Sequence, residues 1–559
     1  MNKIKQYIVV GLLLAPVAVW AQEDWEKPAG GIEDARVVIE KDKVINLRPV
    51  SRRFKVIQFA APEVKPLKVN FQLQDVADSL PPLQVIVRPK TMKDLPIEKL
   101  YGLNARLGYG NYASPYVLLD AGTKRNDTYA LNGYFNHVSS GKGPVIGDFS
   151  AAGITRVGGA AKYFLNNLTL TTGADYRYQT YTIYGYNPEV IDTLVFDHSL
   201  LKQRLNVLAL DIGLVENNVK NNTDHKVTLG INYLINNHEI SEFYYGLAYD
   251  FGFRPDKQWT FDVQAEYTGF NQNGVTISNF SRRLAQLRPT AAYRWNKFTF
   301  TAGVNAFYNY ETNLLSSNPK EFYFYPVATV KYAISSHHEV EAGVDGAIEK
   351  LTLNGLYAEN PYLSETVRVT NNINNFSMMA ALQGQFSGKI GYRVNFQYRH
   401  YNRLLFYNNN SLDTARFDVV YDNGGASISR LAGELSYYIQ DNINISANVA
   451  YNAYTTVDLA EAWQRPVVEA GATADFIILD KLTGHLSYFL LSGIKAQTAA
   501  GEVKTLAAIH DLNVGLNLSL TEKAGIFVDV MNIFGNNYQL YNNYPVKGFQ
   551  VIGGVSYKF

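Results

Sequence analysis

The chain of 559 residues has no cysteine, only 5 methionines and 9 histidines, and a formal net charge of +1. Without cysteine it forms no disulfide and offers no thiolate for catalysis or metal binding. A net charge near zero gives no general attraction for nucleic acid, so we expect no nucleic-acid partner. After the N-terminus there is no run of about 18 apolar residues, which excludes a membrane-spanning helix from that part of the chain. Any crossing of a membrane must therefore use strands.

Aromatic residues are abundant, with 40 Tyr and 29 Phe, while the mean hydropathy is only −0.15. Strands that place apolar side chains on one face and polar side chains on the other average to such mild polarity. Tyrosine and phenylalanine also suit the aromatic girdles that a transmembrane barrel carries at both membrane interfaces. The composition therefore favours an all-β protein of the outer membrane.

The last residues of the chain, FQVIGGVSYKF, read as a strand with one apolar face. Val555, Tyr557 and Phe559 lie on that face at a spacing of two, and Ser556 and Lys558 lie on the other. A strand of this kind that ends on an aromatic residue is typical of outer-membrane barrels. We expect Val555, Tyr557 and Phe559 to act as an assembly signal for the barrel assembly machinery and to contact membrane lipid.

The same alternation recurs along the chain from Tyr101 onward, with charged and amide side chains on the second face. It is clearest in the stretches 259–268, 298–309, 390–399, 443–451 and 512–520. A polar second face must be wet, so these stretches predict a lipid face and a lumen face.

Connection lengths predict the strand count. Short joins, such as Arg254 to Gln258 and Ser387 to Lys389, alternate with longer ones, such as Lys350 to Asn375 and Arg403 to Gly425. Bacterial barrels have short periplasmic turns and longer outer loops. Residues 101–559 are therefore expected to form a transmembrane antiparallel β-barrel of about 22 strands with both ends at the periplasmic rim. A soluble all-β fold would have to imitate each of these signals by coincidence.

The first hundred residues differ in composition from the rest. Lys3 and Lys5 precede an apolar run that closes before Gln22, which predicts a signal peptide over residues 1–21. Residues 22–100 carry many charges and several prolines with few aromatics. We expect them to form a periplasmic segment that is extended or partly disordered. Export to the cell outer membrane of a Gram-negative bacterium follows from these features together.

The two last strands and the join between them resemble the C-terminal end of TonB-dependent receptors. The resemblance rests on Val528 to Tyr538, read as VDVMNIFGNNY, and on the entry of the final strand through Gly548 and Phe549. It covers about 35 residues, and the expected strand count extends it to the barrel. The resemblance implies a wide barrel with a plug inside, import of a large ligand, and energy supplied through a periplasmic partner.

The chain departs from that family where a plug is expected. The segment LPPLQVIVRP, Leu80 to Pro89, is faintly similar to an energy-coupling box, yet it lies directly before the first predicted strand. An extended linker is the favoured interpretation of this segment. The barrel is thus expected to lack a recognisable plug domain of its own.

Charged residues on the predicted lumen face are the candidate site residues. They are Asp262, Glu266, Glu341, Asp345, Arg393, Arg399, Glu434 and Asp529. Their mixed signs favour pairing across the wall, or contact with an inserted segment, over strong ion selectivity. Simple hydration of the wall is an equally good alternative.

No motif for chemistry is present. No histidine pairs with a serine and an acid in a local motif, and His337-His338 has no further ligands nearby in the sequence. We therefore predict no catalytic residues, no cofactor and no metal.

Three functions remain open. The first is transport across the outer membrane together with a periplasmic or outer-membrane protein partner. The second is a non-transporting structural or docking subunit of an outer-membrane complex, and a hydrolase ranks last. For the first of these we also expect the joins Lys350 to Asn375 and Arg403 to Gly425 to fold inward and, with residues 22–100 or a partner, to narrow the passage.

Overall fold

The computed structural model describes residues 101–559 except for 146, 187–200, 218–221, 275–279, 313–319, 440–441, 479–480 and 499. All described residues belong to the unit Ser51–Phe559. The predicted signal peptide, 1–21, and the predicted periplasmic segment, 22–100, lie outside the described residues. Among the helices of the described part, none is long and apolar enough to cross a membrane.

Twenty-two antiparallel strands form a single closed wall. The first eleven are β1 (Leu103–Gly110), β2 (Ser114–Gly122), β3 (Tyr129–Ser140), β4 (Ala152–Phe164), β5 (Leu168–Thr182), β6 (Lys202–Glu216), β7 (Thr223–Asn236), β8 (Ser241–Phe253), β9 (Trp259–Asn273), β10 (Phe280–Trp295) and β11 (Phe298–Glu311). The others are β12 (Lys320–Ala333), β13 (His338–Glu349), β14 (Asn372–Phe386), β15 (Ile390–Asn409), β17 (Ala426–Ile439), β18 (Ile443–Thr455), β19 (Val468–Ile478), β20 (Leu482–Ser492), β23 (Ile509–Ser519), β24 (Ala524–Met531) and β27 (Gln550–Lys558).

The wall closes where its last strand meets its first. β27 pairs with β24 on one side and with β1 on the other, and Gly554 lies directly opposite Gly108 in the second of these pairings. Closure leaves no strand edge exposed to lipid, which a chain in hydrocarbon requires. The predicted fold class and the predicted number of strands are both confirmed.

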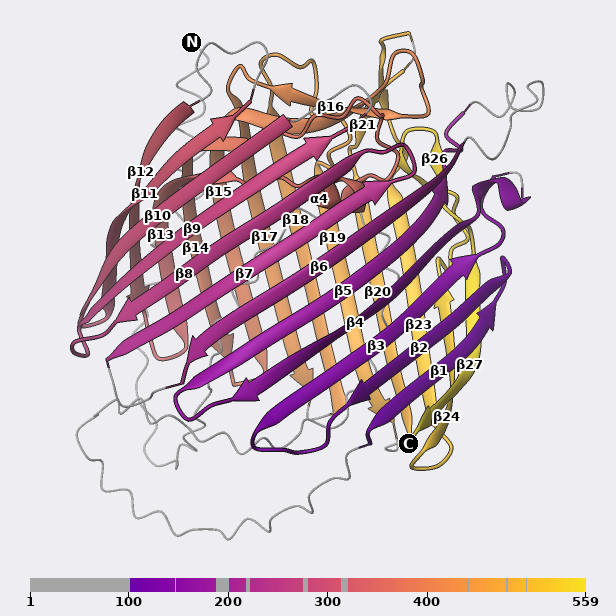
Figure 1. Ribbon diagram of the computed structural model, residues 1–559, viewed down its shortest axis with the longest axis horizontal. Coiled ribbons are helices and arrows are strands. Elements are labelled where there is room, and N and C mark those ends of the chain that lie inside the picture. The colour runs from indigo at the N-terminus through magenta and orange to yellow at the C-terminus, as the bar shows by residue number, and fades with distance from the viewer. Residues whose placement is uncertain are drawn as a thin grey trace, which may run out of the picture. The chain divides into compact units, whose positions relative to one another are not determined.

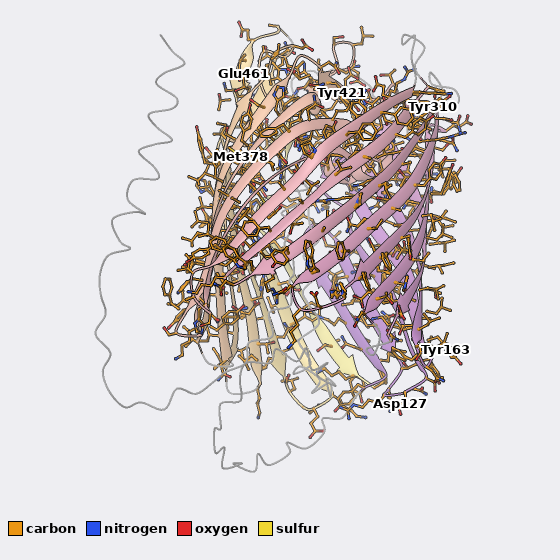
Figure 2. The ribbon with its side chains drawn as sticks, turned by 90° about the vertical axis from the view of Figure 1, so that its left-hand side faces the viewer. Asp127, Tyr163, Tyr310, Met378, Tyr421 and Glu461 are labelled. Carbon is orange, nitrogen blue, oxygen red and sulfur yellow. The ribbon has the colours of Figure 1, made fainter. Side chains whose placement is uncertain are left out.

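The joins alternate between the two ends of the wall (Figure 1). Short joins such as residues 296–297 and 387–389 lie at one end, and joins such as 350–371 and 532–549 lie at the other, which we call the long-join end. Figure 2 places Tyr310, Tyr421 and Glu461 at the long-join end and Asp127 and Tyr163 at the opposite end. This alternation agrees with the pattern of join lengths in the sequence.

The long joins contain secondary structure of their own. They hold η1 (Gly147–Ser150), α4 (Leu353–Glu359), β16 (Phe417–Asp422) and two small hairpins, β21 (Lys495–Gln497) with β22 (Val503–Thr505) and β25 (Gln539–Tyr541) with β26 (Tyr544–Pro545). The sequence interpretation treated Arg403 to Gly425 as one long join, which is wrong. β15 instead continues to Asn409, and its extension, which contains the strand-favouring residues Phe406 and Tyr407, pairs with β16.

The two faces of the wall differ as the alternation predicts. On β1, Leu107 and Tyr109 point outward and are half-exposed or more, whereas Arg106 is completely buried. On the neighbouring β27, Val555 is 56% exposed and Ile552 is buried. Outward apolar side chains are stable only in lipid, so the outer surface of the wall is its lipid face.

The largest buried apolar cluster lies among the joins and the strand ends of the long-join end. It contains eight tyrosines, which are Tyr181, Tyr184, Tyr357, Tyr362, Tyr407, Tyr538, Tyr541 and Tyr544. The abundance of tyrosine therefore has a second source besides the expected interface girdles. Exposed rings such as Tyr163 and Trp295 do lie on the lipid face, but the tyrosines of the cluster pack against one another.

Candidate functional site

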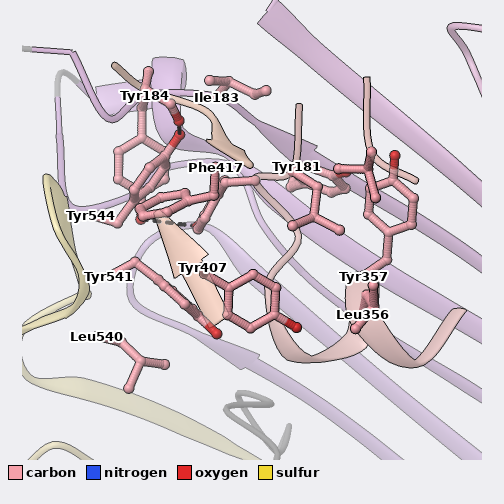
Figure 3. Packing of buried hydrophobic residues seen from close by; sticks show 14 of the residues in the cluster. Tyr181, Ile183, Tyr184, Leu356, Tyr357, Tyr407, Phe417, Leu540, Tyr541 and Tyr544 are labelled. Atoms are coloured by element: carbon pink, nitrogen blue, oxygen red, sulfur yellow. Dashed lines mark hydrogen bonds between the residues drawn. The ribbon is translucent and has the colours of Figure 1, made fainter. Parts of the chain in front are cut away.

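Aromatic rings from several joins and strand ends pack together at the long-join end (Figure 3). We call this group the aromatic lid and define it by Tyr181, Tyr362, Tyr544, Tyr541, Phe417 and Tyr407. Tyr181 belongs to β5 and Tyr407 to β15, which are ten strands apart in a wall of twenty-two. Strands so far apart lie on nearly opposite sides, so the aromatic lid spans the mouth.

Ring distances show that the aromatic lid is packed throughout. The ring centroid of Tyr362 lies 6.0 Å from that of Tyr181 in an edge arrangement and 3.5 Å from that of Tyr544 in a stacked one. Tyr541 then meets Phe417 at 5.4 Å and Tyr407 at 6.4 Å. Edge and stacked pairs at such distances each add about 0.5–1.5 kcal/mol beyond the burial of their area.

Hydroxyl groups of the aromatic lid and of the adjoining Tyr184 are satisfied locally. Tyr544 donates to the carbonyl oxygen of Ala415, and Tyr184 donates to that of Pro545 at 3.0 Å. Burial raises the pKa of Tyr184 to about 12 and that of Tyr362 well above its ordinary value. The tyrosines therefore stay neutral at physiological pH, and the aromatic lid carries no charge from them.

Close backbone approach explains Gly185. A Cβ atom on this residue would overlap the ring of Tyr544, which is itself stacked on Tyr362. Only glycine leaves the ring this space. The β5–β6 join therefore contributes the ring of Tyr184 and, at Gly185, the space that the ring of Tyr544 occupies.

One long join, residues 350–371, occupies the centre of the long-join end and carries α4. Thr352 caps the helix, accepting a hydrogen bond from the backbone N–H of Gly355 at 2.8 Å. Leu353 and Leu356 are buried, and they insert between the ends of wall strands within the large cluster. A helix of seven residues is too short to be stable alone, so its partners at both ends hold it.

A buried ion pair on the wall fixes the N-terminal end of α4. Arg282 of β10 donates to Glu242 of β8 at 3.1 Å, and the two side chains are 1% and 2% exposed. Glu242 also accepts from the backbone N–H of Leu353 at 2.7 Å, while Arg282 donates to the side chain of Asn371 and to the carbonyl oxygen of Leu351. Wall and join thus satisfy each other's buried polar groups.

The C-terminal end of α4 is fixed by Glu359. Its carboxylate accepts from Arg465 at 2.8 Å and from the hydroxyl of Tyr407 at 3.0 Å. Its carbonyl oxygen accepts from the hydroxyl of Tyr541 at 2.7 Å. Three separate segments of the chain therefore meet at this one residue.

A second buried group lies on the lumen face beside the closure of the wall. The guanidinium carbon of Arg106 lies 4.1 Å from the ring centroid of Phe527, and a terminal nitrogen lies 3.7 Å from Asp529. A Cβ atom on either Gly108 or Gly554 would meet the Phe527 ring. The paired glycines therefore make room for a ring that fills the lumen face at the junction.

The structure joins some of the predicted lumen candidates to partners across strands. Glu266 of β9 forms an ion pair with Lys350 next to β13, and Asp345 of β13 lies 3.9 Å from Arg288 of β10. Neither pair joins neighbouring strands, so both interactions span the lumen face.

The other candidates have nearer partners. Glu341 pairs with Lys331 on the adjacent strand at 3.7 Å. Arg393 donates to Gln383 and Arg399 to Gln397, each at 2.8 Å. Glu434 stands opposite Arg393 in the β15–β17 register, Asp529 faces Arg106, and Asp262 stands opposite Gly252 in the β8–β9 register. The eight side chains do not converge on one site.

Sequence reasoning missed the residues that hold the aromatic lid. Glu242, Arg282, Glu359 and Arg465 were not singled out, and neither were the tyrosines of the joins. One signal was available, because residues 532–549 contain three tyrosines in a join, away from any membrane interface. In the part of the chain that the structure describes, no group of three or more His, Asp or Glu side chains is arranged to hold a metal ion.

Comparison with solved structures shows the same barrel in TonB-dependent receptors. The FrpB iron transporter from Neisseria meningitidis (F3-3 variant) superposes with a TM-score of 0.63 at 11% identity, covering 83% of this chain and 82% of that one. The ferric-catecholate import receptor Fiu from Escherichia coli K12 gives a TM-score of 0.60 at 10% identity, with 83% and 82% covered. The copper transporter OprC gives 0.60 at 12% identity, with 82% and 81% covered.

The sequence itself has no such match. No family model and no curated protein sequence matches the chain. At about a tenth identity the structural likeness establishes the fold, that of Gram-negative outer-membrane receptors. The neighbours named here are transporters and receptors rather than enzymes.

Proposed function

We propose that this chain, which folds as the barrel of a TonB-dependent receptor, transports a ligand across the outer membrane together with a separate protein. The observation that carries the proposal is the aromatic lid. It links joins of the long-join end through side-chain contacts, while the wall completes its own backbone hydrogen bonds without it. Such a closure can open without breaking the barrel.

Opening needs a source of free energy. The aromatic lid is buried and neutral, and α4 is held at both ends by hydrogen-bonded carboxylates. A ligand or partner that binds the open arrangement better shifts the equilibrium by its difference in affinity. We therefore expect the protein alone to be closed and a partner to drive opening.

Conductance in a planar bilayer tests the closed state. The purified full chain should conduct weakly, and the double variant Tyr362→Ala/Tyr544→Ala should conduct strongly, because it removes the stacked pair at the centre of the aromatic lid. The matched control is Tyr163→Ala, which removes a half-exposed ring on the lipid face. Strong conductance by the unmodified protein would contradict the proposal.

Co-purification tests the partner. Extraction of the native membrane in mild detergent should recover the chain with a periplasmic or outer-membrane protein. Adding that protein to the bilayer should change the conductance of the full chain. If the chain is recovered alone in several detergents and at several salt concentrations, the proposal of transport with a partner is wrong.

A docking subunit is the second candidate, and the rigidity of the aromatic lid favours it. An ion pair holds each end of α4, buried at Arg282–Glu242 and partly buried at Arg465–Glu359, as a permanent closure requires. The absence of cysteine permits a direct test, because Arg177→Cys and Asn354→Cys can be joined by a short bis-maleimide reagent. These two side chains are hydrogen-bonded to each other and connect wall strand β5 to α4. A locked protein that still complements deletion of its gene indicates docking, and one that fails to complement indicates transport.

A further inference from the structure

A cavity of about 350 Å³ lies at the long-join end where five joins converge. The β3–β4 join, the β5–β6 join, the β15–β16 hairpin and the hairpins β21–β22 and β25–β26 each contribute to it. Its lining side chains are Val145, Tyr184, Tyr186, Asn409, Thr414, Gln497, Thr498, Lys504, Gln539, Asn542, Asn543 and Pro545. The volume is within the range of small-ligand sites, about 300–1,000 Å³.

The lining of the cavity is rich in carboxamide side chains. Five of the twelve lining residues are Asn or Gln, two are Thr and two are Tyr, whereas the lining includes one cation, Lys504, and no carboxylate. A carboxamide both donates and accepts, as a sugar hydroxyl does. A tyrosine adds an apolar ring face with a polar tip. Together they match a polyhydroxylated, uncharged ligand.

Part of the lining is pre-arranged by hydrogen bonds. Lys504 donates to Asn542 at 3.4 Å, and Asn542 donates to the side chain of Asn409 at 3.2 Å. Asn409 in turn donates to the carbonyl oxygen of Thr414 at 2.9 Å. This chain orients three of the side chains before any ligand arrives, which lowers the entropic cost of binding.

Other lining groups retain hydrogen-bonding capacity. The side-chain oxygen of Gln539 accepts from the backbone N–H of Asn543 at 3.1 Å. The amide nitrogen of Gln539 and the side-chain amide of Asn543 make no hydrogen bond to any described residue. Asn543 holds a left-handed backbone at φ 69°, which places it at the turn of its hairpin. Two partly exposed amides are thereby presented to the cavity.

We propose that this cavity binds a neutral oligosaccharide. An anionic chelate or a carboxylate ligand would call for a cluster of arginines, and the lining contains none. The inference rests on the proposed transport function in one respect, which is that the saccharide is taken to be the transported ligand. Binding itself requires the aromatic lid to be closed, because Tyr184 and Pro545 line the cavity and are hydrogen-bonded within the closed arrangement.

The test is calorimetric titration of the full chain in a detergent without a sugar headgroup, since maltoside or glucoside detergents would compete. The probes are maltotriose, cellotriose and a chitin trisaccharide, with trialanine as a peptide of similar size. At least one saccharide should bind at one site. Gln539→Ala and Asn543→Gly should each weaken it about tenfold, because each removes an amide that bonds the ligand. Glycine at 543 keeps the left-handed turn.

The matched control is Gln258→Ala, an exposed carboxamide at the opposite end of the barrel, which should leave the affinity unchanged. The inference is overturned if no saccharide binds, if the variants bind as tightly as the unmodified chain, or if trialanine binds through the same two residues. The result of the bilayer experiment is independent of the result of this titration. If the barrel is closed and can be opened but binds no saccharide, the transport proposal stands and the saccharide site does not. If the unmodified barrel conducts strongly but binds saccharide, only the saccharide site stands.

Discussion

Arg282 and Glu242 form a buried ion pair at the long-join end, with side chains 1% and 2% exposed, and removing one partner leaves the other charge buried without its counter-charge. Arg282→Met should therefore destabilise the protein by about 3–5 kcal/mol. The measurement is the urea midpoint of unfolding in detergent, followed by proteolysis of the join 350–371. That join should become sensitive because Arg282 also binds Leu351 and Asn371.

Two further variants isolate the effect of the buried charge. Arg282→Met/Glu242→Gln should recover part of the loss, since no unpaired charge remains. Arg254→Met breaks an ion pair with Asp224 whose two side chains are more than half exposed. It should cost less than about 1 kcal/mol. An equal loss in Arg282→Met and Arg254→Met would refute the assignment.

At this scale the sequence could predict which strand positions face the lumen, and it could not predict which residues meet. Alternation places Glu266 on the polar face, but its partner Lys350 is 84 positions away in the chain. Leu353 and Glu242 are separated by 111 positions. Pairings of this kind depend on how far a join folds inward. No repeating pattern in the sequence predicts that folding.

Among the elements, we expect changes in the terminal strand β27 to affect assembly of the barrel most strongly. It supplies one half of two pairings, with β24 and with β1, and Val555, Tyr557 and Phe559 project from its lipid-facing side. Deleting Val555 to Phe559 should severely reduce the amount of membrane-inserted protein, because an unpaired edge would face hydrocarbon. Immunoblots of outer-membrane fractions measure this. Serine substitution of Leu412, a fully exposed side chain in a join, serves as the control.

The aromatic lid should open in alkali. Burial raises the pKa of Tyr184 and of Tyr357, which belong to the same buried cluster as the aromatic lid, to about 12 from an ordinary value of 10.0. Below pH 10 both closed and open states keep the protons, and the stabilisation is complete. Between about pH 10 and 12 only the open state loses them, so the closed state weakens as pH rises.

Bilayer conductance together with tyrosinate absorbance follows this transition. Conductance should rise over that pH interval, and Tyr362→Phe should make the rise shallower because it removes one titrating group and keeps the ring. Tyr163→Phe, on the lipid face, should leave the conductance profile unchanged. A conductance that stays constant up to pH 12 would show that these hydroxyls do not stabilise the closed state.

Period-two alternation was sufficient to predict the wall strands, since each must show one face to lipid along its length. It was not sufficient for α4 or β16. A helix of seven residues has no room for a 3.6-residue pattern to repeat. β16 packs against apolar clusters with both of its faces, Val419 and Tyr421 against one cluster and Val420 against another, so its alternation does not mark a lipid face.

The molecule as a whole satisfies its wall backbone internally, and this predicts its behaviour on extraction. Unheated protein should migrate on gels as a compact, strand-rich species and shift after boiling, because opening a closed barrel requires many hydrogen bonds to break together. Cell fractionation should recover it in outer membranes. A soluble periplasmic pool, or migration that heating does not change, would contradict the membrane assignment.

The aromatic lid also constrains how this protein can evolve. Each of its joins packs against rings supplied by the others, so a substitution at Tyr362 or Tyr544 is tolerated only with a matching change in a different join. Piecemeal exchange of one join between relatives would leave a void in the cluster. Variation should therefore accumulate at tips such as Leu412, which is 96% exposed, while the joins that share the rings are inherited as a set.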